Sequence, residues 1–244
     1  MRLVVTRPEP DGSRLARHLE MYDIESLRVP LLEVRDRQNV FLPNEPMQAV
    51  LATSANGVRA LRNHNDFRRF KPLPIFTVGD ASAAQAQASG FGEVHSASGD
   101  MAALQTLVKR NLSPDDGPLF YVTGSKIAGD LTGLLADDGF KVFRAVLYDA
   151  IAIDVLPQSL IDAVGANQVD GVILMSPRAA KIWGARVLDA SADHIFAKLR
   201  YYCLSSAVKA ALQAGLKVED THIIIADQPT QNALIEGVLT QKNP

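Results

Sequence analysis

The chain has 244 residues, enough for two α/β domains that each bury a core of ordinary size. Apolar residues make up 47% and charged residues 21%, which are ordinary globular values that argue against extended disorder. The formal net charge is only -2 and no long basic stripe occurs, so nucleic acid is not expected as a partner.

The single cysteine, Cys203, excludes an intramolecular disulfide and a multi-cysteine metal site. The first eight residues reach charge and proline before an apolar stretch long enough for a signal peptide. The apolar runs are strand-sized and far short of the ~20 residues that a membrane helix needs. We therefore expect a cytoplasmic protein that has no membrane partner.

Strand-length apolar runs alternate with helical periods along the whole chain. Strands are expected near 3–6, 24–28, 49–52, 75–78, 118–122, 140–142, 170–174, 200–203 and 223–226. One of the intervening helices is marked by Leu15, Leu19 and Tyr22, and another by Ile127, Leu131, Leu134 and Leu135. Two alanine-rich helices are expected to end at Gly90 and Gly215, where glycine can take the left-handed conformation. This alternation predicts an α/β fold with parallel sheets and helices on both faces.

Short motifs of the first half recur in the same order in the second half. Residues 3–7 correspond to 119–125, 50–56 to 172–178, 76–83 to 202–208, and 100–104 to 230–234. The period is far longer than that of a solenoid, so the pattern predicts two similar domains produced by duplication.

Two segments interrupt this rhythm, 27–36 and 143–154. Each alternates apolar with polar residues, which is typical of a two-stranded ribbon with one exposed face. If both cross between domains, the first domain consists of 1–30 plus 152–244 and the second of 38–144. The paired linker strands, 31–37 and 145–151, would then form a two-stranded antiparallel β-ladder that joins them. A simple division near residue 117 also fits the pattern.

Several familiar sites are missing from the sequence. No Gly-x-Gly-x-x-Gly follows a strand, and residues 123–126 lack the earlier glycine of a phosphate loop because position 119 is leucine. The five histidines are scattered without metal-ligand spacing, and no serine can be tied by spacing to a histidine and an aspartate. We therefore expect neither a metal nor a cofactor.

A serine or threonine recurs between a strand end and a helix start. Such a residue can simply cap the helix, a contribution of ~1 kcal/mol. Several of them at the carboxyl edges of two parallel sheets would instead line a cleft with hydroxyls and free N–H groups, which suits a polyanion. The candidate substrate-binding residues are Thr6, Arg7, Thr53, Ser54, Ala55, Asn56, Gly79, Ser82, Thr123, Gly124, Ser125, Lys126, Ser176, Pro177, Arg178, Ser205 and Ser206.

Six short motifs follow one another along the chain, at 4–8, 53–58, 78–83, 146–148, 175–179 and 205–206. Their order and spacing resemble the uroporphyrinogen-III synthase family over essentially the full length. The resemblance implies two α/β domains joined by a two-stranded ladder. It also implies cyclisation of hydroxymethylbilane, a linear tetrapyrrole rich in carboxylates, with inversion of ring D and loss of water. Uroporphyrinogen III, the product, serves haem, sirohaem or cobalamin biosynthesis. No metal or organic cofactor is implied.

The resemblance also suggests a catalytic residue and partners. Tyr148 matches the tyrosine that the family places beside its cleft, and a phenol with an ordinary pKa of ~10 can donate a proton to the departing hydroxyl. Equally, its ring could merely pack on an amphipathic ribbon. Hydroxymethylbilane synthase could hand over the substrate. We expect a monomer, because a cleft within one chain requires no partner.

The sequence departs from the family pattern at three places. Asn56 replaces an arginine, Leu204 replaces the glycine of the second turn, and Ala207 replaces a threonine. Two other functions stay open from the residues. One is a cytosolic two-domain protein that binds a polyanionic small molecule without catalysis. The other is a nucleotide-dependent transferase, which the missing phosphate and dinucleotide loops disfavour.

Overall fold

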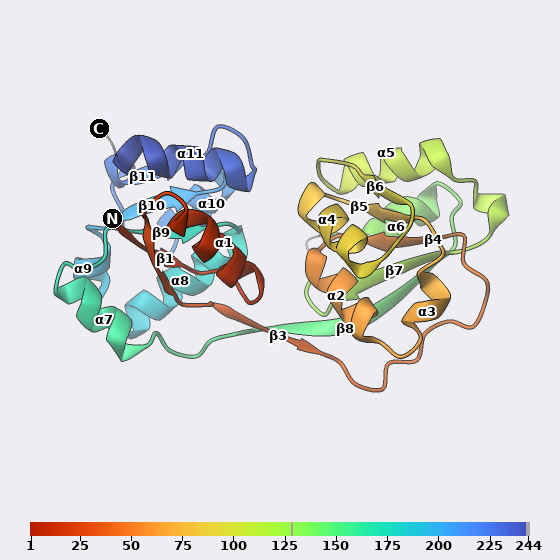
Figure 1. The fold of residues 1–244 in the computed structure, drawn as a ribbon, viewed down its shortest axis with the longest axis horizontal. Helices are drawn as coiled ribbons and strands as arrows, with labels where there is room; N and C mark the ends of the chain where they lie inside the picture. The colour runs from red at the N-terminus through yellow and green to blue at the C-terminus, as the bar shows by residue number, and fades with distance from the viewer. Residues whose placement is uncertain (128, 243–244) are drawn as a thin grey trace. The chain divides into compact units, whose positions relative to one another are not determined.

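The computed structural model describes residues 1–127 and 129–242 and contains two compact units (Figure 1). Unit 1 consists of Met1–Glu33 and Ile151–Pro244, and unit 2 consists of Val34–Ala150. Unit 2 is thus continuous in sequence, whereas unit 1 combines the two ends of the chain.

Unit 1 contains a five-stranded parallel sheet in the order β11-β10-β9-β1-β2. Its strands are β1 (Arg2–Val5), β2 (Glu25–Arg28), β9 (Gly171–Leu174), β10 (Arg200–Cys203) and β11 (Ile223–Ile225). Its helices are α1 (Asp11–Glu20), α7 (Gln158–Gly165), α8 (Pro177–Asp189), α9 (Asp193–Phe196), α10 (Ser206–Gln213) and α11 (Gln231–Lys242), with a short 3-10 helix at Asp220–His222. Successive residues of β9 alternate between two apolar clusters, so both faces of the sheet are covered.

Unit 2 contains a sheet in the order β3-β8-β7-β4-β5-β6. Its strands are β3 (Leu32–Asp36), β4 (Ala49–Ala52), β5 (Ile75–Thr77), β6 (Val94–Ser96), β7 (Leu119–Gly124) and β8 (Val142–Ala152). Its helices are α2 (Ala55–Asn63), α3 (Phe67–Phe70), α4 (Asp80–Ser89), α5 (Met101–Asn111) and α6 (Leu131–Asp137), with a 3-10 helix at Pro114–Asp116. Strands β4 to β8 are parallel, and successive side chains of β4 and β7 alternate between two apolar clusters.

The two sheets are built alike. The order β11-β10-β9-β1-β2 in unit 1 matches β6-β5-β4-β7-β8 in unit 2. The residues before α2 and α8 also have nearly the same backbone, since Ser54 has φ -152° and ψ 150° and Ser176 has φ -155° and ψ 150°. The predicted α/β fold class with two similar parallel-sheet domains is confirmed.

Strand β3 lies beside β8 at the edge of its sheet. Ile153 N–H donates to the Leu31 carbonyl (3.1 Å), and Arg37 N–H donates to the Leu147 carbonyl (2.8 Å). Residue numbers rise along one strand as they fall along the other, so the pair is antiparallel. The predicted short strand at 140–142 and the ribbon after it are one continuous strand, β8, because its first half extends the parallel sheet beside β7.

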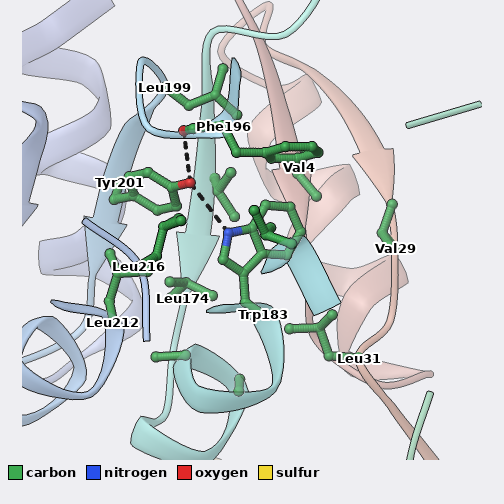
Figure 2. Close-up of a cluster of buried hydrophobic side chains, with 14 of the residues drawn as sticks. Val4, Val29, Leu31, Leu174, Trp183, Phe196, Leu199, Tyr201, Leu212 and Leu216 are labelled. Atoms are coloured by element: carbon green, nitrogen blue, oxygen red, sulfur yellow. Dashed lines mark hydrogen bonds between the residues drawn. The ribbon is translucent and has the colours of Figure 1, made fainter. Parts of the chain in front are cut away.

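The largest buried side chain of unit 1, Trp183, lies between α8 and the sheet (Figure 2). Its indole N–H donates to the Tyr201 hydroxyl (3.3 Å), which donates to the Phe196 carbonyl (2.9 Å). Burial raises the pKa of the Tyr201 phenol, so it stays protonated and can make both bonds. These bonds let polar atoms lie within an apolar core.

Four sequence expectations need correction. Strand β6 was not predicted, because only one of its three residues, Val94, is apolar. Helix α6 begins at Leu131, so Ile127 lies outside it and is exposed. Helix α1 ends before Tyr22. Gly90 has the expected positive φ of 93°, but Gly215 is not in the left-handed region.

Gly215 instead allows two helices to approach. A Cβ added to Gly184 of α8 would lie 3.1 Å from the carbonyl carbon of Gly215, just after α10. A side chain at Gly184 would therefore meet backbone. Across the described ranges 1–127 and 129–242, helices long and apolar enough to cross a bilayer are absent.

Candidate functional site

In unit 2 the carboxyl ends of the parallel strands bring several predicted residues to one sheet edge. Thr53 and Ser54 follow β4, Gly124 ends β7, and Tyr148 lies where β8 stops pairing with β7. Strand β7 separates β4 from β8 in the sheet. The side chains of Ser54 and Tyr148 nevertheless meet, with 2.8 Å between the Ser54 Oγ and the Tyr148 hydroxyl.

Ser54 is also the N-cap of α2. Its Oγ accepts a hydrogen bond from the Gly57 N–H at 3.2 Å, which is what a serine in this position does. One lone pair is thus in use, and the serine proton is available for the Tyr148 oxygen. Tyr148 is only 8% exposed, and its hydroxyl lies beside the serine that caps α2, at the positive end of that helix.

Gly124 makes room for the tyrosine ring. A Cβ at Gly124 would lie 2.7 Å from Tyr148 Cζ, 2.8 Å from Cε2 and 3.1 Å from the hydroxyl oxygen. The ring therefore packs directly on the glycine backbone. Ser125 N–H donates to the Tyr148 carbonyl (3.0 Å), which ties the turn after β7 to β8.

An ion pair lies next to Tyr148. Arg37 donates from Nε and Nη2 to the two carboxylate oxygens of Asp149, at 2.8 and 2.9 Å. These hydrogen bonds and one from the Ser125 side chain lower the pKa of Asp149 to about 2. The carboxylate in turn raises the pKa of Arg37. The sequence pattern placed Asp149 on the ribbon but indicated no role for it.

Other predicted residues of unit 2 differ in how accessible they are. Thr123 and Ser82 are buried, and Thr123 Oγ1 donates to the Gly124 carbonyl (3.3 Å). Thr53 Oγ1 lies 3.1 Å from the Tyr121 hydroxyl. Gly79 is the N-cap of α4. The remaining three are Ala55 and Asn56, which are half-buried in the first turn of α2, and Lys126, which is exposed.

Arg59 is a cation that the sequence motifs did not single out. It lies three residues after Asn56, so the two share one face of α2. Its guanidinium donates to the Asn56 side-chain oxygen and, at 3.0 Å, to Gln85 Oε1 of α4. The three-residue spacing of Asn56 and Arg59, which places both on one helix face, was the sequence signal that could have identified Arg59.

In unit 1 the carboxyl edge carries the remaining candidates. Thr6 is 2% exposed, and its hydroxyl donates to the Ile173 carbonyl (2.8 Å), so it joins β1 to β9. Arg7 donates to Asp11 (3.2 Å) and to Gln231 (3.5 Å). The guanidinium of Arg7 is therefore oriented by α1, through a residue four positions later, and by α11, through a long-range contact that no local pattern indicated.

The turns before α8 and α10 differ. Ser176 Oγ accepts from the Ala179 N–H at 3.1 Å, with Pro177 as the first helical residue. Ser205 has the extended backbone of an N-cap but makes no side-chain cap hydrogen bond. The last two candidates are Arg178, half-buried in the first turn of α8, and Ser206, exposed in the first turn of α10.

Two hollows are lined by other residues. One is lined by the segment after β3 and the first half of β8, and the other by α1 and β2. Neither is lined by a predicted site residue. The part of the chain that the structure describes has no group of three or more His, Cys, Asp or Glu side chains that could hold a metal ion.

Comparison with known proteins gives consistent matches. A family model described as "Uroporphyrinogen-III synthase HemD" matches residues 13–236. The fold is similar to the crystal structure of uroporphyrinogen-III synthetase from Helicobacter pylori, with a TM-score of 0.60, 17% identity and 98% of each chain covered. It is also similar to a mutant uroporphyrinogen III synthase from Thermus thermophilus, with a TM-score of 0.57, 15% identity and full coverage of both chains. No curated protein matches the sequence.

Proposed function

Since the chain belongs to the uroporphyrinogen-III synthase family, we propose that it cyclises hydroxymethylbilane to uroporphyrinogen III in haem, sirohaem or cobalamin biosynthesis. The family match over residues 13–236 is the observation that carries this function. The two solved structures support the fold. A binding protein without catalysis, the main alternative from the sequence, is not favoured.

The proposed reaction is a cyclising carbon–oxygen lyase reaction. The hydroxymethyl C–O bond breaks, the leaving oxygen takes a proton, and the electron pair of the pyrrole nitrogen forms an azafulvene. Ring D attacks through its substituted α-carbon, the spiro intermediate fragments, and the ring closes at the other α-carbon, which gives up its hydrogen. One water leaves and no electrons are transferred to or from another molecule. We therefore propose that no cofactor takes part.

Tyr148 is the proposed proton donor to the leaving hydroxyl. Ser54 Oγ lies 2.8 Å from its oxygen and can donate to it, which leaves the phenol proton for the substrate. The phenolate formed would lie at the N-terminal end of α2, where a helix favours a negative charge by ~0.3–1 kcal/mol. Low exposure strengthens this interaction, since little water screens it.

The carboxyl edge of each unit is the proposed place for substrate carboxylates. Helix N-termini with serine caps, at Ser54 and Ser176, and the oriented cations Arg7 and Arg59 supply donors for anions. Thr6, Ser82 and Thr123 are buried, so we propose that they stabilise the turns at this edge without contacting the substrate. A cytoplasmic location, a monomeric state and substrate transfer from hydroxymethylbilane synthase stay predictions.

The function is tested with hydroxymethylbilane as substrate. Uncatalysed closure gives the type I isomer, so the two isomers are resolved by chromatography after oxidation to porphyrins. We expect type III product with native protein and type I with heat-unfolded protein. Activity should survive dialysis against EDTA. Type I product alone, formed at the uncatalysed rate, would refute the assignment.

The role of Tyr148 is tested with the Tyr148→Phe variant. Loss of a general acid lowers turnover by about a hundredfold or more. The hydrogen bond to Ser54 contributes only ~0.5–1.5 kcal/mol to stability, so the variant should fold. Full activity would remove Tyr148 from the reaction while leaving the synthase assignment intact.

A further inference from the structure

Strands β7 and β8 lose their regular register beside Tyr148. Thr123 pairs with Val146, but the next residue of β7, Gly124, pairs with Tyr148, so Leu147 is an extra residue on β8. A bulge of this kind re-aims the side chains that follow it. In an unbroken ladder Leu147 would have faced Gly124. The bulge is therefore what places the Tyr148 ring on the glycine.

Both neighbours of Tyr148 are held by a single residue, Arg37. Its backbone N–H donates to the carbonyl of Leu147 (2.8 Å). Its guanidinium makes two parallel bonds to the carboxylate of Asp149 (2.8 and 2.9 Å). Arg37 thus fixes the residue before the tyrosine through its backbone and the residue after it through its side chain.

Asp149 connects this clamp to the turn that supports the ring. The Ser125 side chain, on that turn, helps to lower the pKa of the Asp149 carboxyl. The Ser125 N–H donates to the Tyr148 carbonyl, and Gly124, the preceding residue, underlies the tyrosine ring. A change at Asp149 would therefore be transmitted to both the strand and the turn that enclose Tyr148.

We propose that Arg37 and Asp149 are positioning residues that fix the bulge and so aim the Tyr148 hydroxyl at Ser54 and at the substrate. The proposal rests on the proposed role of Tyr148 as proton donor. The pair is 112 residues apart in sequence and partly exposed. An exposed ion pair joined by one contact contributes little to stability. A bidentate arginine–carboxylate pair, in contrast, fixes the relative orientation of the two side chains. The expected effect of the pair on turnover is therefore through the position of Tyr148 and not through loss of the folded state.

The test compares Asp149→Asn, Arg37→Gln and Arg37→Lys with the parent protein. A displacement of about 1 Å at the acid lowers kcat by about tenfold to a hundredfold, and KM should change by less than about twofold. Lysine keeps the charge but cannot make two parallel bonds, so Arg37→Lys should resemble Arg37→Gln. If Arg37→Lys is as active as the parent, charge alone matters and the proposal is overturned.

A merely structural role is separated by two further measurements. In a Tyr148→Phe background, Asp149→Asn should lower kcat no further, because the positioned group is gone. By NMR, a Gly124 Hα that faces the Tyr148 ring has a ring-current shift, and this shift should shrink in Asp149→Asn. Equal loss in both backgrounds, or an unchanged Gly124 shift, would overturn the proposal.

Asp138→Asn is the matched control. Asp138 is likewise held by a cation, Lys109, and in addition by the Gln105 amide, in the same unit but away from Tyr148. It should keep parental kcat. If Tyr148→Phe itself is fully active, the proposed acid fails. If Tyr148→Phe is impaired but Asp149→Asn is not, only the positioning role fails.

Discussion

Gly124→Ala tests whether the place of the Tyr148 ring controls turnover. The new methyl carbon would lie 2.7 Å from Tyr148 Cζ, so the ring must retreat by about 0.7 Å to reach the ordinary contact distance of 3.4 Å. The φ of Gly124 is not positive, so alanine fits the backbone itself and the effect comes from the ring.

The expected loss follows from this displacement. The ring belongs to one of the two apolar clusters of unit 2, so it has little room to move without straining its neighbours. Overpacking of this size costs ~1–3 kcal/mol in stability. Moving the phenol away from Ser54 should also lower kcat by about tenfold to a hundredfold.

The assay measures kcat for type III product and the free energy of unfolding by urea. Gly165→Ala is the control, because a Cβ there would meet no atom within 4 Å and the position lies in α7. It should keep full activity. Parental kcat in Gly124→Ala, with the protein folded, would show that the ring position does not limit the reaction.

Three further predictions concern stability. Ser176→Ala removes the cap of α8 and should lower the free energy of unfolding by ~1 kcal/mol in urea titrations, and no change would mean that water replaces the cap. Gly184→Ala places a Cβ 3.1 Å from the backbone of Gly215 and should cost ~1–3 kcal/mol, unlike Gly165→Ala. The pKa of Asp149 is about 2 instead of 3.8, so its contribution to stability is present above pH about 4 and is lost as the pH falls towards about 2. Asp149→Asn should therefore make the free energy of unfolding less dependent on pH in that range. The same pH dependence in the variant as in the parent protein would contradict the ion pair.

The fold was largely predictable because its determinants are local. Apolar runs such as 172–174 form buried strands, and serines such as Ser54 and Ser176 begin the helices that follow. A cap depends only on a residue and the N–H three positions later, so a sequence pattern contains all of it. Strand β6 was missed because its three residues carry too little apolar signal.

The candidate site was predictable only in part. The sequence placed Ser54 and Gly124 at strand ends and singled out Tyr148 through a family resemblance, but it assigned nothing to Arg37. At Gly215 the local sequence pattern gave a wrong prediction. It predicted a left-handed residue at the end of a helix, but the glycine instead lets α8 pack closely against the residues after α10.

By itself, the sequence determined the α/β class, the internal duplication and the serines that cap the helices. Only the tertiary structure decided that Tyr148 meets Ser54, 94 residues away, and that Arg37 holds both neighbours of the tyrosine. The physical reason is register: a slip of one residue moves every side chain of a strand to the other face. The register of β8 at Tyr148 depends on the bulge opposite Gly124 and on hydrogen bonds between residues far apart in sequence, which no local periodicity encodes.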